Sequence, residues 1–257
     1  MKFRFSVLIL LLAFLLQSCD SSSDSSDDSS SSSAASSSSG FNFETGTFTD
    51  SRDGQIYGYV VVEERTWMTQ NLNYGTMIPG DSAQENDNAV EKYCYNDDSS
   101  NCANYGALYQ WAEALALSAT CDTSDCSSSA SSSEHQGICP DGWHIPLSAE
   151  WDTLAERLGG EEVAGMTMKL DNTSNSSWNS SANNDGNTSG FSAYPLGMRD
   201  EYGDFSSFGS YAYFWTLYEG NEVYAQGRYL RNGIAYLRSE NFNKQNGFAI
   251  RCVQDTI

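Results

Sequence analysis

Two segments of the chain place apolar residues at helical spacing. In 106–117 the apolar positions are Leu108, Trp111, Ala112, Leu115 and Ala116. In 148–158, apolar residues recur at i, i+3, i+4 and i+7 after a serine suited to capping, and a Gly-Gly pair follows. Because this period buries one side of a helix, we expect two main helices here. A short third helix is expected within 163–170.

Elsewhere the apolar pattern shortens to strand length. The expected strands are 56–62, 211–218, 222–230, 233–238 and 247–253. Alternation of Tyr224, Gln226, Arg228 and Leu230 fits an antiparallel strand with one face in solvent. The predicted fold class is therefore α+β, with two main helices packed on an irregular antiparallel sheet and many loops.

Polar tracts divide the chain. Residues 20–40 contain 14 Ser and 4 Asp and no large apolar side chain, so nothing there offsets the entropy of ordering the backbone. We expect 19–40 to be a disordered Ser/Asp-rich tether and 41–257 to be a single domain. Within that domain, 118–136 is interpreted as a Ser-rich loop insertion and 171–189 as a polar loop.

The N-terminus carries targeting information. Lys2 and Arg4 precede an apolar run that is shorter than the roughly 20 residues needed to span a bilayer. The run ends at Leu16-Gln17-Ser18-Cys19, which resembles the lipobox of bacterial lipoprotein signal peptides. The resemblance implies a signal peptide over 1–18 and a lipid anchor on Cys19. An ordinary cleaved signal with an incidental Cys19 is the alternative.

The charge balance excludes one class of partner. The chain carries 34 acidic and 13 basic side chains, a net charge of −21. Such a surface repels polyanions, so no nucleic-acid partner is expected. Solubility outside the cell is the plainest reason for so many acids.

Six cysteines remain after Cys19, an even number in an exported chain, and indicate three disulfides. Fifteen connectivities are possible. Spacing favours two local loops and one long connection, which would pair Cys94 with Cys102, Cys121 with Cys126, and Cys139 with Cys252. With two histidines and no paired C-x-x-C, neither a zinc site nor another cofactor is expected.

Motifs along the domain resemble those of one bacterial family. They are Asp50–Tyr57, Thr66–Tyr74, Tyr93–Asp97, Tyr105–Ala114, Gly137–Pro146, Ser189–Ala193, Phe214–Thr216 and Gly247–Val253. Their order and extent resemble the Fibrobacter succinogenes major paralogous domain. Two departures are a longer connector at 118–136 and Tyr194-Pro195-Leu196 where Leu-Pro-Gly is more familiar.

The family resemblance implies a C-type-lectin-like fold, related to the formylglycine-generating enzymes. Residues 144–151 and 247–253 resemble the helix entry and the terminal strand of those enzymes. Kinship of fold does not transmit chemistry, and the copper chemistry of those enzymes needs free thiols. His144 is interpreted as a structural hydrogen-bonding residue rather than part of a nucleophilic triad. We therefore expect no enzyme.

Aromatic and amide side chains supply the candidate ligand site. Tyr211, Tyr213, Trp215 and Tyr218 form a stripe on one predicted strand, and Tyr224 lies on the next. Such rings stack on sugars, although inward-facing core aromatics are the alternative. Five charged residues are expected either to form surface pairs of little energetic value or to rim a groove: Arg199, Glu201, Glu219, Arg228 and Arg238.

The loop 171–189 offers oxygen ligands for calcium, or is simply a polar loop. The candidate ligands are Asp171, Asn172, Asn183, Asn184, Asp185 and Asn187.

Together these features predict a lipid-anchored, non-catalytic binding module at the cell surface, in the outer membrane. Its expected partners are membrane lipid, through N-terminal acylation, and a polysaccharide. The alternatives are a protein-binding adhesion or scaffold module and, less favoured, a glycoside-processing enzyme. Asp20 leaves open which membrane holds the anchor. The sequence predicts no oligomeric state.

Overall fold

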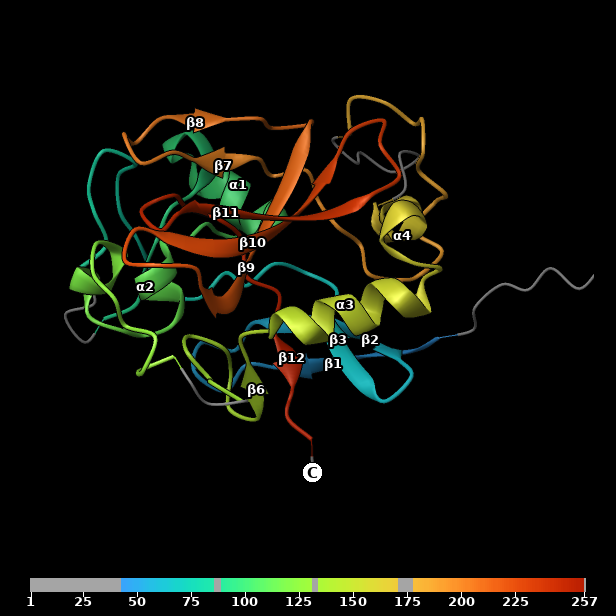
Figure 1. Cartoon of the computed structure of the whole chain (residues 1–257), viewed down its shortest axis with the longest axis horizontal. Coiled ribbons are helices and arrows are strands. Elements are labelled where there is room, and N and C mark those ends of the chain that lie inside the picture. The colour runs from blue at the N-terminus through green and yellow to red at the C-terminus, as the bar shows by residue number, and fades with distance from the viewer. Residues whose placement is uncertain (1–42, 86–88, 131–133, 171–177, 257) are drawn as a thin grey trace, which may run out of the picture. The chain divides into compact units, whose positions relative to one another are not determined.

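Five short strands form the first sheet of the computed structural model, which describes residues 43–85, 89–130, 134–170 and 178–256. In sheet order they are β1 (Glu44–Thr49), β2 (Ile56–Val62), β3 (Arg65–Met68), β12 (Val253–Gln254) and β6 (Trp143–His144), all paired antiparallel. The last strand of the chain therefore lies between β3 and β6, which come much earlier in the sequence (Figure 1). The predicted signal peptide, the tether and Cys19 fall outside the described residues.

The second sheet has three antiparallel strands. They are β9 (Tyr211–Glu219), β10 (Tyr224–Arg231) and β11 (Leu237–Asn243), with β10 in the centre. The register between β9 and β10 shifts between Ala225 and Gly227, which is the signature of a β-bulge. Two small pairs complete the strands: β4 (Thr76–Met77) with β5 (Glu91–Lys92), parallel, and β7 (Met198–Arg199) with β8 (Phe205–Ser206), antiparallel.

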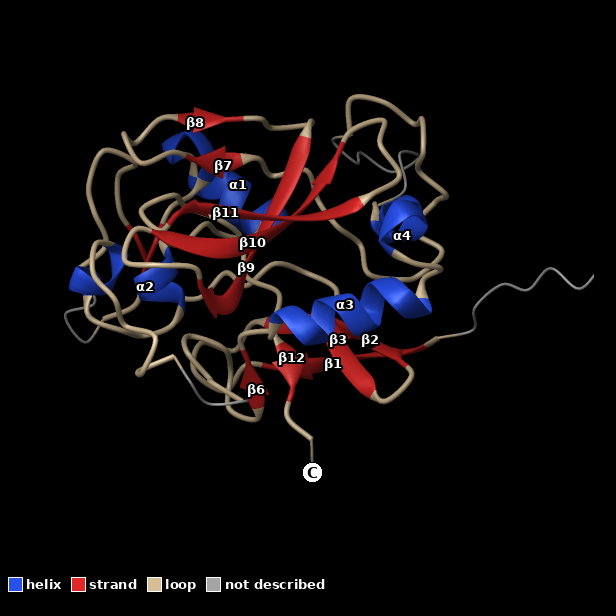
Figure 2. Cartoon of the chain, viewed as in Figure 1, coloured by secondary structure: helices blue, strands red, loops and turns tan. Residues whose placement is uncertain are grey.

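Helices are few and short. They are α1 (Ser99–Tyr105), α2 (Trp111–Ala114), α3 (Ser148–Arg157) and α4 (Glu161–Met168), with 3-10 turns at Tyr95–Asp97 and Ala119–Asp122 (Figure 2). The mixed α/β class with antiparallel sheets and disulfides is confirmed, but strands dominate over helices.

Helix α3 follows the local signals of its sequence. At its start the Leu147 amide donates to Glu150 Oε2 at 3.0 Å. At its end Gly159 and Gly160 have φ values of +100° and +98°, which terminate a helix at little cost because glycine has no Cβ. The cap lies at Leu147, one residue before the serine expected to provide it.

The expected helix over 106–117 is largely wrong. Only Trp111–Ala114 is helical, because Leu108 and Tyr109 instead form β-bridges with Tyr93 and Phe248. Those bridges connect segments far apart in the chain and satisfy the backbone groups that a local helix would have used.

Two expected strands also differ. Residues 232–233 form a turn, in which Gly233 has a φ of +70°. Residues 234–236 are irregular, and β11 starts only at Leu237. In 247–253, Gly247, Phe248 and Ala249 make isolated bridges to three different segments, so the expected strand is irregular.

The core surrounds α3, which packs between the two sheets (Figure 1). Trp151 of α3 lies 4.8 Å, ring centroid to ring centroid, from Trp67 of β3 and 5.4 Å from Phe214 of β9. A second cluster centres on Trp111, Trp215 and Phe248. Large rings give these short elements enough apolar area to bury.

The three predicted disulfides are confirmed: Cys94–Cys102, Cys121–Cys126 and Cys139–Cys252. The last joins residues 113 apart, and closing so long a loop in the unfolded chain contributes about 4–5 kcal/mol.

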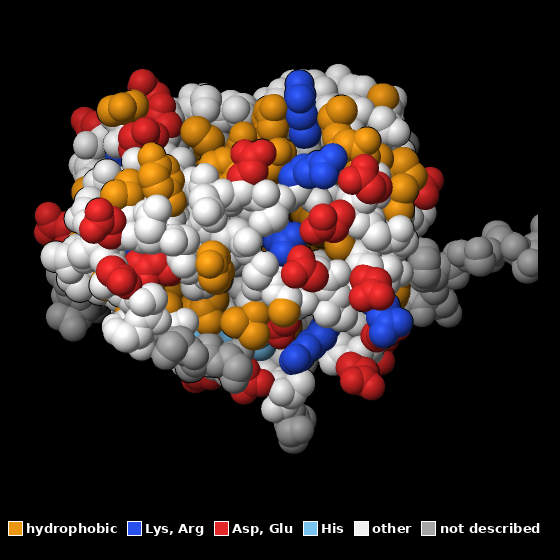
Figure 3. All heavy atoms as spheres, in the orientation of Figure 1, with side chains coloured by type: hydrophobic (Ala, Val, Ile, Leu, Met, Phe, Trp, Pro, Cys, Tyr) orange, Lys and Arg blue, Asp and Glu red, His pale blue; other side chains and the backbone are white. Residues whose placement is uncertain are grey.

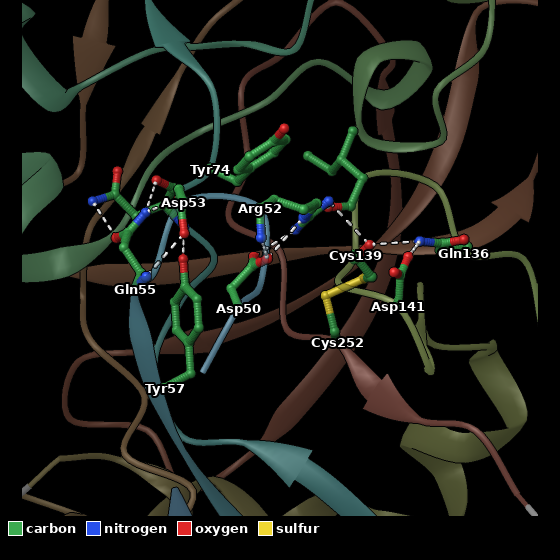
Figure 4. Close-up of polar contacts among 12 residues, drawn as sticks. Asp50, Arg52, Asp53, Gln55, Tyr57, Tyr74, Gln136, Cys139, Asp141 and Cys252 are labelled. Atoms are coloured by element: carbon green, nitrogen blue, oxygen red, sulfur yellow. Dashed lines mark hydrogen bonds and ion pairs between the residues drawn. A yellow bond between two sulfur atoms is a disulfide. The ribbon is translucent and has the colours of Figure 1, made fainter. Parts of the chain in front are cut away.

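The Asp50–Tyr57 motif is attached to that long disulfide (Figure 4). Arg52 Nε and Nη2 donate to the two carboxylate oxygens of Asp50 at 2.9 and 2.7 Å, and Nη1 donates to the carbonyls of Ile138 and Cys139. Its guanidinium lies 3.9 Å from the ring centroid of Tyr74. One arginine thus fixes three separate segments, so this motif has a structural purpose.

Among the described residues, none of the helices is both long and apolar enough to cross a membrane.

Candidate functional site

Pairing in the three-stranded sheet gathers aromatic and cationic side chains on its outer face. Tyr213 of β9 is opposite Tyr229 of β10, which is opposite Arg238 of β11. Arg231, two residues after Tyr229, is opposite Tyr211. Because cross-strand partners point to the same side, these five residues share one face, which we call the tyrosine face.

The three tyrosines of this face contact one another. Tyr211 and Tyr213 stack with centroids 5.3 Å apart and planes 7° from parallel. Tyr229 lies 6.1 Å from the first ring and 5.9 Å from the second. All three side chains are half-buried, so they offer a fixed, partly exposed aromatic surface.

The aromatic stripe then descends into the core. Tyr213 stacks on Phe248 at 4.9 Å, and Phe248 stacks on Trp215 at 4.3 Å. Trp215 is fully buried, and its indole nitrogen donates to the Tyr109 carbonyl at 2.8 Å. The outer tyrosines are therefore held by packing from below, whereas Trp215 is a core residue out of reach of solvent.

The Tyr229 hydroxyl donates to Glu240 Oε1 at 2.8 Å. Burial, together with this hydrogen bond and the carboxylate charge, raises the pKa of Tyr229 to about 12. The phenol therefore stays protonated at neutral pH, and its oxygen remains able to accept a hydrogen bond.

Lysine and arginine side chains adjoin hydrophobic ones over the upper part of β9 and β10 (Figure 3). Here Tyr229, Arg231, Ile234, Tyr236 and Arg238 line a shallow hollow of about 200 Å³. The Arg238 guanidinium lies 4.1 Å from the centroid of Tyr236, and that of Arg231 lies 5.7 Å from the centroid of Tyr211. The hollow thus combines rings with two positive charges.

The structure does not bring Arg199 or Arg228 to this face. Arg228 points to the opposite side of β10, where it is buried and pairs with Asp152 and Glu161. Arg199 is buried beside Tyr93, with its guanidinium donating to the carbonyls of Gly80 and Gln245 at 2.8 and 3.0 Å. Both have protein partners, so they support the fold.

Tyr218 and Tyr224 lie toward the other end of the hairpin. Both are exposed, and Tyr224 borders an open hollow formed largely by the β9–β10 turn. They are separate from the three stacked tyrosines. The sequence analysis did not predict Arg231 as a site residue. Arg231 lies two positions after Tyr229 on the same strand, so strand alternation places both side chains on the same face of β10.

In the described part of the 171–189 loop, three asparagine side chains donate hydrogen bonds to residues outside the loop. Asn183 donates to the Gly233 carbonyl, Asn184 to the Leu170 carbonyl and Asn187 to Ser192 Oγ. Asp171 and Asn172 lie outside the described residues. Within the described ranges, no group of three or more His, Cys, Asp or Glu side chains has metal-binding geometry.

His144 is a buried structural residue, as its sequence context predicts. Its Nδ1 lies 2.7 Å from Asp255 Oδ1, and its Nε2 lies 3.1 Å from Glu150 Oε2. Burial by itself lowers the pKa of His144, but the two carboxylates outweigh it and the pKa is raised. The ring thus links Asp255, near the end of the described chain, to Glu150 of α3.

Fold and disulfides together define a disulfide-bonded mixed α/β domain with a half-exposed aromatic face. A family model for the Fibrobacter succinogenes major domain matches residues 60–254, and the chain belongs to this family. No curated protein and no solved structure matches the chain.

Proposed function

We propose that this chain is a non-catalytic binding module of the bacterial cell surface that binds polysaccharide through the tyrosine face. The observation that carries the proposal is the half-exposed cluster of Tyr211, Tyr213 and Tyr229, in which the first two rings stack and Tyr213 rests on Phe248. Sugar rings present apolar faces of C–H groups, which pack well on fixed aromatic rings.

Polar groups beside the rings support the same reading. Tyr229 keeps a protonated hydroxyl, and Glu240 accepts from it. A site of apolar surface with a few well-placed polar groups is typical of sugar recognition, because the hydroxyls of the ligand need partners when they leave water.

The test is retardation of the purified domain in native gels containing soluble polysaccharides. We expect retention by at least one polymer, and its loss in the Tyr211→Ala, Tyr229→Ala double variant. Tyr202→Ala is the matched control, because Tyr202 is 81% exposed in the turn between β7 and β8. Retention on no polymer, or equal retention of both variants, would contradict the proposal.

We further propose that acylation of Cys19 anchors the domain in the outer membrane, with 19–40 as tether. Three disulfides support export, since such bonds persist in oxidising compartments. Mass spectrometry of the mature N-terminus in the native host tests this. A diacylated or triacylated Cys19 is expected, and an unmodified Cys19 would overturn the anchor.

A further inference from the structure

Arg231 differs from every other cation of the described chain. All eleven Lys and Arg residues that follow the predicted tether lie in described segments. Six pair with carboxylates: Arg52, Arg65, Arg157, Arg228, Arg238 and Lys244. Four donate to carbonyl or amide oxygens: Lys92, Lys169, Arg199 and Arg251. The side chain of Arg231 alone has no hydrogen bond or ion pair to any residue that the structure describes, although its backbone carbonyl accepts from the Ile234 amide.

This isolation is unexpected in so acidic a chain. With 34 carboxylates and 13 cations, acidic partners are abundant, yet Arg231 is exposed and its guanidinium lies against the ring of Tyr211. The ring contact leaves the N–H donors of the guanidinium open to a ligand.

Arg238 supplies a second charge that a ligand can recruit. Its pair with Glu162 is 3.4 Å long, and the two side chains are 41% and 66% exposed. A long pair in solvent contributes little, so exchanging Glu162 for a ligand carboxylate costs little. The two arginines flank Tyr229, one along the same strand and one across from it.

We infer that the tyrosine face binds an acidic polysaccharide, one that carries carboxylates as uronic acids do, with Arg231 as the principal carboxylate-binding residue and Arg238 as the second. This inference rests on the proposed function and names its ligand class. A guanidinium matches a carboxylate with two parallel hydrogen bonds. The tyrosine rings beside the two arginines pack against the sugar rings, so each uronate unit contacts both an aromatic ring and a guanidinium.

Net charge sharpens the specificity. The net charge of −21 disfavours a polyanion over most of the surface, and on the tyrosine face the Glu240 carboxylate beside Tyr229 opposes it as well. An acidic polymer must therefore bind where positive charge is unpaired, and its affinity must fall as salt screens that contact.

The experiment compares two polymers that share a backbone: polygalacturonate and its fully methyl-esterified form. Titration calorimetry at low salt should show binding to the acid and at least about tenfold weaker binding to the ester, because hydrogen bonds to a charged group are stronger than neutral ones. Arg231→Gln should weaken binding to polygalacturonate by about tenfold and leave binding to the ester unchanged. Arg238→Gln should have the same sign and a smaller effect.

Arg157→Gln is the matched control, because Arg157 is a half-exposed arginine of α3 that pairs with Glu63 away from the tyrosine face. It should bind as the unaltered protein does. Equal affinity for both polymers, or unchanged binding by Arg231→Gln, overturns the acidic specificity while the proposed function stands. Absence of binding to these and to neutral polysaccharides overturns both.

Discussion

On the inner face of the β9–β10–β11 sheet arginine side chains are enclosed by protein, whereas on its outer face they reach solvent. Arg228 and Arg231 show the difference most directly, because they lie three residues apart on one strand. The first is 2% exposed and held by two carboxylates and Ser148. The second is exposed and rests on a tyrosine ring. The inner charge therefore serves the fold, and the outer one is free to serve a ligand.

Arg251 is another arginine that is enclosed by protein. It is fully buried, with its guanidinium 4.5 Å from the centroid of Phe191 and 5.5 Å from that of Phe214, a residue on the inner face of β9. It donates to Asn71 Oδ1 and to the carbonyls of Met68, Phe191 and Ser192. One side chain thus joins the loop at 191–192 to the segment after β3.

The largest expected effect is that of Arg251→Met. Removing the guanidinium leaves four acceptors without their donor in the core, and each unsatisfied buried acceptor costs about 1–3 kcal/mol. We expect the free energy of unfolding to fall by about 4 kcal/mol or more, as measured by urea denaturation followed by tryptophan fluorescence. If Arg251→Met lowers the free energy of unfolding no more than Arg231→Met does, the contrast between enclosed and exposed arginines is wrong.

Arg228→Met should have an intermediate effect. The methionine keeps most of the buried volume, and Asp152 and Glu161 are 58% and 49% exposed, so water can solvate them once the arginine is gone. The expected loss is about 2 kcal/mol. Adding Asp152→Asn and Glu161→Gln should recover part of it, and no recovery would show that the loss comes from packing alone.

His144 is a buried side chain whose charge, and therefore its ion pairs with Glu150 and Asp255, depends on pH. Because its folded-state pKa is raised above the ordinary 6.5, its stabilisation is complete below pH about 6.5 and is lost as pH rises through the folded-state pKa. His144→Gln should therefore lower the free energy of unfolding by about 2 kcal/mol at pH 5.5 and by less at pH 9. A gap that widens toward alkaline pH would contradict the charged state of the ring.

The smallest expected effect on stability is that of Arg231→Gln. An exposed side chain without a hydrogen bond or ion pair contributes within about 0.5 kcal/mol, so the melting temperature should be nearly unchanged while binding to polygalacturonate weakens about tenfold. A clear drop in melting temperature would show that Arg231 supports the fold and would remove it from the outer group.

Local sequence signals predicted a helix correctly where the residues that start it, pack it and end it all lie close together in the chain. For α3, the apolar period, Glu150 and the two glycines lie within the helix or beside it, and the expected helix formed. The segment before α2 had the same apolar period but a different outcome, because Leu108 and Tyr109 form isolated bridges to Tyr93 and Phe248, which lie outside the segment. Periodicity describes one side of an element and does not name its partner.

The arrangement of the candidate site was likewise predicted only in part. Strand alternation correctly placed Tyr211 and Tyr213 on one side of β9, and Arg228 and Leu230 together on one side of β10. It could not show that Phe248 would cover Trp215, that carbonyls would surround Arg199, or that the β10–β11 turn would place Arg238 beside Tyr229. The first two depend on contacts between segments far apart in sequence, and the third depends on where the hairpin turn falls.

The motifs of the sequence indicated the family, and period-two alternation grouped the residues on each strand face. Short spacing favoured the disulfides Cys94–Cys102 and Cys121–Cys126, and the third pair was the one that remained. Tertiary structure decided which face of the sheet is covered by α3 and α4 and which stays open. A strand presents two faces of similar composition, and only the packing of other elements against one of them determines whether an arginine becomes part of the core or remains available to a ligand.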